Sequence, residues 1–213
     1  MDFSAKLKGN LTEGICVSIL EEAGYRVTHF GIEKTLKDLS FLTQDKYLSL
    51  GLTDTLRLMP DLIVAELDMS AVWLVEVKYR KNFKPFIGHG ELYEKLKRQA
   101  EAWGDFWVLI FVNEPDEEKK RLRLDSEVFR APGSKVVEFA SDYCGVLKVG
   151  LFEDKKTLGF YKKTDNTLLK WSNLKWGDLS RIGSVFAKVG AKATSGSPIE
   201  KSMRIVREFH KLT

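Results

Sequence analysis

Two apolar segments joined by a short connection constrain the fold of this 213-residue chain more than any other feature. They cover residues 61–65 and 71–79, and in both the apolar side chains fall on the two faces of a strand. Strands that are apolar on both faces are typical of the centre of a sheet. The connection, residues 66–70, is short enough for a hairpin. We therefore expect two central, antiparallel strands.

The segments around this hairpin predict a layered fold. Residues 11–23 repeat apolar side chains at four-residue steps, which indicates an amphipathic helix that Gly24 stops. A strand is expected at 25–30, a second helix at 91–103 and another strand at 106–112. The order helix, strand, hairpin, helix, strand predicts an α/β or α+β layered core.

The character of the chain changes after Asn113. A charge run at 114–123 is our candidate boundary, so we expect a core over 1–113 and an extension over 114–213. The extension is expected either to complete the sheet or to add a nucleic-acid-binding or dimerisation unit. Short strands are expected at 136–139, 145–152 and 158–161, and a last helix is expected to begin at Ser197 as N-cap.

Charged side chains interrupt the apolar hairpin at one end. A turn centred between Asp68 and Met69 places Asp61 opposite Glu76, where the two Cβ atoms would be roughly 4.5 to 5.5 Å apart. Lys78 is two residues further along and therefore shares a face with Glu76. Such a buried cluster is costly unless something offsets it.

A divalent cation would offset the two carboxylates. Mg²⁺ and Mn²⁺ prefer one or two carboxylates and keep their other positions for water and phosphate oxygens. A cation held in this way polarises a phosphodiester and lowers the pKa of a bound water. Lys78 would then orient or deprotonate the attacking water, or neutralise the pentacovalent phosphate.

Pro60-Asp61, followed after fourteen residues by Glu76-Val77-Lys78, resembles the PD-(D/E)XK nuclease superfamily. Type II restriction enzymes, Holliday-junction resolvases and RecB-like exonucleases belong to that superfamily. The resemblance implies a restriction-endonuclease-like three-layer core (helix, mixed sheet with the catalytic hairpin, helix) with a smaller C-terminal α+β unit. It also implies that Asp61, Glu76 and the Val77 carbonyl hold Mg²⁺ or Mn²⁺, and that Lys78 is the catalytic lysine.

The resemblance extends to both helices of the first half. Glu13 looks like the additional acidic residue that many members place near the metal. Gln99 with Trp103 is similar to the Q-x-x-x-Y helix element of RecB-like members, with Trp in place of Tyr. Lys95 lies one turn after Glu91, and a surface ion pair between the two is a sufficient explanation for it.

Simpler explanations exist for the same residues. Glu76 and Lys78 can form a solvated ion pair at a strand end, worth about 0 to 1 kcal/mol. Asp61 can cap the turn after Pro60. Glu13 can be an exposed residue in the first turns of its helix, where the helix dipole favours a negative charge.

Two basic stretches are candidates for nucleic-acid contact. Arg80, Lys81 and Lys84 follow the catalytic strand, where cations meet the phosphates beside a cut. Lys162 and Lys163 lie in a second stretch that interleaves basic and aromatic residues. The chain has 34 basic and 30 acidic residues, so any phosphate-binding surface requires local segregation of charge.

These observations favour a Mg²⁺-dependent DNA endonuclease. A homodimer is expected because a symmetric pair of sites most simply cuts both strands of a duplex. The alternatives are a non-catalytic nucleic-acid-binding protein of the same fold, a nuclease-fold protein that acts on RNA, or a nuclease-fold subunit of a mobile-element or defence system. Cys16 and Cys144 lack metal-ligand spacing, and neither a signal peptide nor a membrane span is apparent, so a cytoplasmic location is expected.

Overall fold

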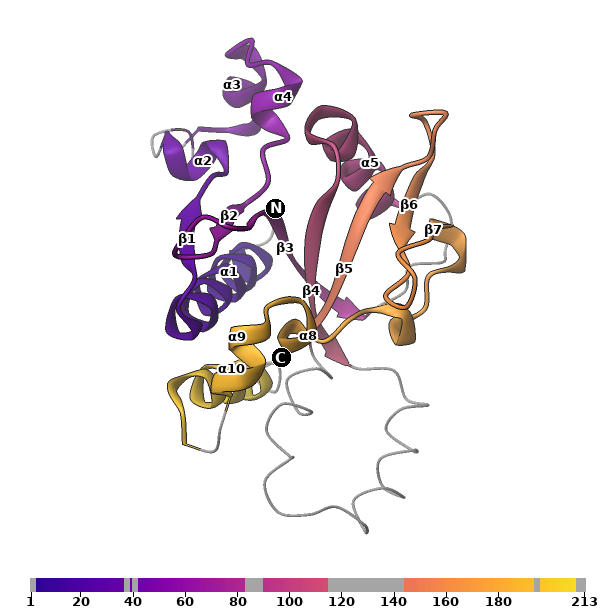
Figure 1. Ribbon diagram of the computed structural model, residues 1–213. Helices are drawn as coiled ribbons and strands as arrows, with labels where there is room; N and C mark the ends of the chain where they lie inside the picture. Colours follow the sequence, from indigo (N-terminus) through magenta and orange to yellow (C-terminus); the bar gives the residue numbers. More distant parts are fainter. Residues whose placement is uncertain are drawn as a thin grey trace.

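The computed structural model describes residues 3–36, 39, 42–82, 90–114, 144–193 and 196–209. Within these residues the chain has an α/β architecture with one mixed sheet of seven strands (Figure 1). The strands lie in the sheet in chain order: β1 (Arg26–His29), β2 (Leu62–Ala65), β3 (Val72–Asn82), β4 (Phe106–Glu114), β5 (Cys144–Leu151), β6 (Leu158–Tyr161) and β7 (Leu168–Lys170). Among these described strands only β3 and β4 are parallel neighbours; the other adjacent strands are antiparallel. The predicted α/β class is confirmed.

Helices surround this sheet. They are α1 (Phe3–Ala23), α2 (Ile32–Thr35), α3 (Gln44–Ser49), α4 (Asp54–Arg57), α5 (Glu91–Trp103), α8 (Ile182–Val185), α9 (Ala187–Lys192) and α10 (Pro198–Phe209), with 3-10 turns η3 (Trp171–Asn173) and η4 (Trp176–Asp178). The short helices α2 to α4 form an excursion between β1 and β2, which the sequence did not predict in this form (Figure 1). In the described ranges no helix has both the length and the apolar character needed to cross a membrane.

Helix α5 connects the two parallel strands. Parallel neighbours require a crossover, because a tight turn cannot return the chain to the same end of the sheet. The helix buries Tyr93, Leu96, Gln99 and Ala100 and ends at Gly104, whose φ of 75° is readily adopted only by glycine. Its bounds match the predicted helix at 91–103. As a result, the buried side chains of α5 pack against one face of the sheet, in the hydrophobic core that includes Val108 and Ile110 of β4.

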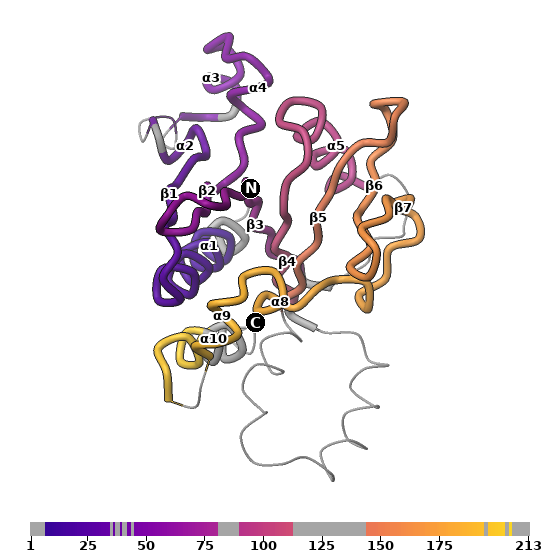
Figure 2. Tube along the Cα trace, in the orientation of Figure 1, coloured from indigo at the N-terminus to yellow at the C-terminus, as the bar shows by residue number. Residues whose placement is uncertain are grey.

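The two faces of the sheet carry separate hydrophobic cores. On one face α1 packs with α8, α9 and α10, and the core includes Ile19, Val75 and Phe186. On the other face α5 and the two 3-10 turns cover a core that includes Leu96 and Ile110. Helices α1 and α10 lie side by side although they come from opposite ends of the chain (Figure 2). The described residues therefore form three layers: helices, sheet, helices.

The C-terminal part of the chain continues the same sheet. Strands β5 to β7 extend it beyond β4, and Phe186 of α8–α9 packs against Tyr25 and Trp73 from the first half. The last helix begins as predicted, because the Ser197 side chain accepts a hydrogen bond from the Glu200 backbone N–H at 3.1 Å. The strand expected at 136–139 lies outside the described residues. Strands β5 to β7, all of which follow residue 114, thus lie in the same sheet as β1 to β4.

Candidate active site

The β2–β3 hairpin has the predicted register. Leu62 pairs with Val75, which places Asp61, directly before β2, opposite Glu76. Val75 and Val77 belong to the core beneath α1, so the alternating residues Glu76 and Lys78 point to the opposite face, toward α5. The hairpin therefore brings the predicted acidic pair and lysine to one place.

Glu76 is the buried centre of this cluster, with only 1% of its side chain exposed. Its Oε1 atom contacts the ammonium of Lys78 and lies 3.3 Å from the ammonium of Lys95 on α5. Its Oε2 atom accepts a hydrogen bond from Gln99 Nε2 at 2.7 Å. This burial contradicts the explanation of Glu76 and Lys78 as a solvated pair at a strand end.

Asp61 is held by the neighbouring strand. Its Oδ2 atom accepts a hydrogen bond from the Val77 backbone N–H at 2.7 Å and lies 3.7 Å from Lys78 Nζ. The same ammonium donates to the Val77 carbonyl at 3.1 Å. Three oxygen atoms, from Asp61, Glu76 and the Val77 carbonyl, thus surround a single cationic group.

Each charged group of the cluster shifts the pKa of its neighbours. Burial raises the pKa of Asp61 to about 7, and the nearby carboxylate of Glu76 acts in the same direction. Burial also opposes the charge of Glu76, but the ammonium groups of Lys78 and Lys95 outweigh it and hold the pKa of Glu76 below its ordinary value. Burial likewise disfavours the Lys78 ammonium, yet Glu76 and Asp61 together raise the pKa of Lys78. One carboxylate is therefore firmly ionised and the other is ready to lose its proton near neutrality.

The donor set fits a hard divalent cation. Two carboxylates and a carbonyl already enclose one cationic group, and oxygen ligands of this kind suit Mg²⁺ and Mn²⁺. Gln99 adds a second observation: its NH₂ group donates to Glu76, which fixes the amide orientation. Its Oε1 atom is then left buried without a hydrogen-bond partner among the described residues, and it could accept a hydrogen bond from a water. The described residues contain no group of three or more His, Cys, Asp or Glu side chains that would hold a metal by themselves, so such a cation would rely on the Val77 carbonyl and water.

The two other helix residues predicted to belong to the site have different surroundings. The Glu13 carboxylate contacts His29 Nδ1 at 2.9 Å and Lys34 Nζ at 3.6 Å, so its described contacts are not with the cluster. Gln99 does contact the cluster, but Trp103, one turn later, donates to the Thr55 carbonyl at 3.0 Å. Trp103 therefore joins α5 to the α2–α4 excursion.

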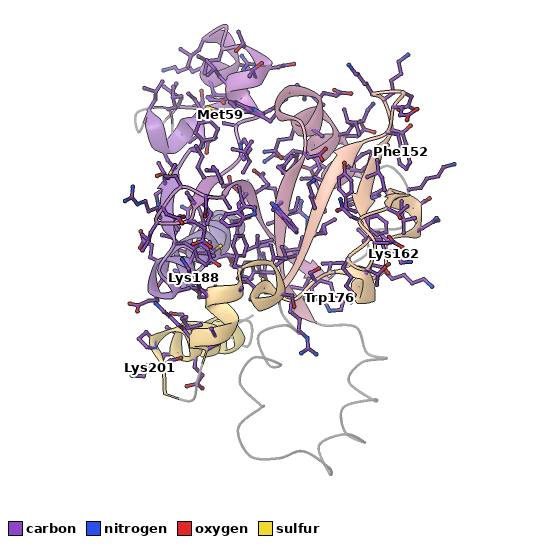
Figure 3. All side chains as sticks on the ribbon, in the orientation of Figure 1. Met59, Phe152, Lys162, Trp176, Lys188 and Lys201 are labelled. Carbon is purple, nitrogen blue, oxygen red and sulfur yellow. The ribbon has the colours of Figure 1, made fainter. Side chains whose placement is uncertain are left out.

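The residues predicted to contact nucleic acid separate into two groups. Arg80 shares a strand face with Glu76 and Lys78 by alternation. The side chain of Lys81 and all of Lys84 lie outside the described residues. Lys162 pairs with Asp165 at 3.4 Å, and Lys163 donates to the Gly177 carbonyl at 3.0 Å. Both of these lysines follow β6, which β4 and β5 separate from β3 (Figure 1), and Figure 3 shows Lys162 on this side of the molecule.

Lys95 is the residue that the sequence interpretation missed. We expected a surface ion pair with Glu91, whereas the structure places its ammonium at the buried carboxylate of Glu76. The available signal was its spacing: Lys95 precedes Gln99 by four residues and so lies on the same stripe of α5.

Comparison of the chain with protein families, curated proteins and solved structures found no match. The geometry of the cluster therefore carries the functional argument.

Proposed function

We propose that this chain is a metal-dependent deoxyribonuclease with a restriction-endonuclease-like core, and that it hydrolyses DNA phosphodiester bonds as an endonuclease. One observation carries the proposal: the oxygen atoms of Asp61, Glu76 and Val77 converge on a single cationic group at the buried end of a hairpin. The same arrangement fits Mg²⁺ or Mn²⁺, which when bound would supply Lewis-acid activation of a water and of the phosphate.

The roles of the chain's own residues follow from their contacts. Asp61, Glu76 and the Val77 carbonyl would hold the cation, and Gln99 fixes the orientation of the Glu76 carboxylate. Because the pKa of Lys78 is raised, this side chain is an ammonium at neutral pH and is better suited to donate than to accept a proton. Lys78 would therefore orient the attacking water and stabilise the negative charge that develops on the phosphate.

Plasmid nicking tests the function directly. We expect supercoiled DNA to be nicked or linearised with Mg²⁺ or Mn²⁺ and to remain intact in EDTA. Parallel assays with duplex, single-stranded and branched DNA and with RNA would identify the substrate class. Binding of these nucleic acids without metal-dependent cleavage of any of them would instead support a non-catalytic binding protein, in which Lys78 and Glu76 form a structural ion pair.

Metal binding is expected to depend on pH through Asp61. Its pKa is about 7, so below pH 7 the metal must displace a proton from this carboxyl group. We expect the apparent Mn²⁺ affinity to rise roughly tenfold per pH unit below pH 7 and to level off above it. Titration calorimetry in buffers of different ionisation enthalpy would measure the affinity and the proton released. An affinity that stays flat from pH 5.5 to pH 8 would contradict this assignment.

A further inference from the structure

Two lysines, Lys78 and Lys95, contact the same buried carboxylate, Glu76. Lys78 contacts both acidic residues, while Lys95 approaches Glu76 Oε1 separately, from α5, at 3.3 Å. The two lysines also differ in exposure: 11% of the Lys78 side chain is exposed, against 47% for Lys95. Lys78 therefore lies beneath the site, and Lys95 reaches it from the solvent side.

Counting charges indicates what the second lysine is for. With both carboxylates ionised, the two acids and the two lysines balance each other. A bound divalent cation would leave the cluster with two positive charges in excess. A phosphodiester carries one negative charge, and the pentacovalent species formed when hydroxide attacks it carries two. With both lysines in place, the metal-loaded cluster thus complements the transition state of hydrolysis better than the ground state.

The geometry also leaves Lys95 free to change its partner. A cation coordinated by Glu76 Oε1 would compete with the Lys95 ammonium for that atom. Lys95 has a long, flexible side chain that is half exposed, so its ammonium can turn from Glu76 toward an anion arriving from solvent. Lys78 is more deeply buried: its ammonium donates to the Val77 carbonyl at 3.1 Å and lies 3.7 Å from Asp61 Oδ2.

We propose that Lys95 is a second phosphate-binding lysine, which contacts a non-bridging oxygen of the scissile phosphate, and that α5 is the wall of the site along which the DNA backbone passes. This inference rests on the proposed nuclease function. It assigns a substrate contact to a residue on the crossover helix, separate from the catalytic hairpin.

The variants Lys95→Met and Lys97→Met test this contact. Lys97 lies on the same helix and pairs with Glu101 at 3.7 Å, so its variant removes the same charge without touching the cluster. With enzyme in excess over plasmid and Mg²⁺ present, we expect Lys95→Met to cleave about 100-fold more slowly and Lys97→Met to stay within about threefold of wild type. Lys95→Arg, which keeps the charge, should recover part of the rate.

Two measurements without turnover complete the experiment. The first measures binding of a short duplex with Ca²⁺ in place of Mg²⁺. The slope of log affinity against log salt should become less steep by about 0.9 in Lys95→Met, as expected for one lost phosphate contact, and stay unchanged in Lys97→Met. Mn²⁺ affinity of Lys95→Met should be equal to or tighter than that of wild type.

Three results would distinguish failure of the proposed Lys95 contact from failure of the proposed nuclease function. If the wild type cleaves and the two methionine variants behave alike, Lys95 has no substrate contact and the nuclease assignment stands. If Lys95→Met loses Mn²⁺ binding, Lys95 only positions Glu76, and the proposed contact is wrong. If the wild type shows no metal-dependent cleavage of any substrate, the proposed function fails and the inference fails with it.

Discussion

Replacing Lys78 by methionine is expected to slow metal-dependent cleavage by about 10²- to 10³-fold while tightening Mn²⁺ binding. The rate falls because the variant lacks the buried ammonium that stabilises the developing charge on the phosphate. The affinity rises because the Lys78 ammonium contacts the same three oxygen atoms that would coordinate the cation. A like charge about 4 Å away costs a few kcal/mol even at an intermediate dielectric, so we expect at least about a tenfold gain.

Single-turnover cleavage and titration calorimetry with Mn²⁺ would measure the two effects of Lys78→Met. Lys97→Met is a suitable control, because the Lys97 ammonium pairs with Glu101 on α5 and its described ion pair is not with the cluster. The proposed role of Lys78 would be wrong if Lys78→Met cleaved within threefold of wild type, provided that its circular dichroism spectrum showed a folded protein.

The variant Asp61→Asn is expected to bind Mn²⁺ weakly and to cleave DNA slowly. An amide is a much weaker ligand for a hard cation than a carboxylate, so we expect Mn²⁺ affinity to fall by about 100-fold or more and cleavage by about 10³-fold. Asparagine keeps an oxygen for the hydrogen bond from the Val77 backbone N–H, which makes this change milder for the fold than Asp61→Ala.

Asp61→Asn also has an expected effect on stability. The pKa of Asp61 is raised from 3.8 to about 7, so the folded state binds the proton more tightly than the unfolded state. The stability contributed by the protonated carboxyl group is full below about pH 4 and is lost as the pH rises to about 7. In EDTA at pH 8, Asp61→Asn should therefore be more stable than wild type by about 1 to 3 kcal/mol, measured by urea unfolding. A variant less stable than wild type at pH 8 would show that the ionised carboxylate stabilises the fold.

Together these two variants distinguish a metal site from a structural ion pair. Both variants should slow cleavage strongly, yet Lys78→Met should bind Mn²⁺ more tightly and Asp61→Asn more weakly. In a merely structural cluster, neither change would shift Mn²⁺ affinity in a systematic direction. Opposite shifts of the Mn²⁺ affinity, with a similar loss of cleavage, would therefore support two assignments. Asp61 would be a metal ligand, and the Lys78 ammonium would contact the metal-binding oxygen atoms when no metal is bound.

The sequence alone determined the hairpin and the acidic pair on it. Side chains alternate between the two faces of a strand, so a turn centred between Asp68 and Met69 was enough to set Asp61 opposite Glu76. The observed pairing of Leu62 with Val75 confirms this register. Helix α5 could be predicted equally well, because its apolar stripe and Gly104 are local signals. Each of these features depends on residues that are close together in the chain.

Only the tertiary structure decided which distant side chains meet. The stripe that holds Lys95 and Gln99 was visible in the sequence, but its contact with Glu76 depends on how the crossover places α5 over β3. The continuation of the sheet through β5 to β7 and the packing of α10 on α1 likewise join residues far apart in the chain. Periodicity reports which face of an element is apolar; the element that covers this face is set by long-range packing, which leaves no repeating signal in the local sequence.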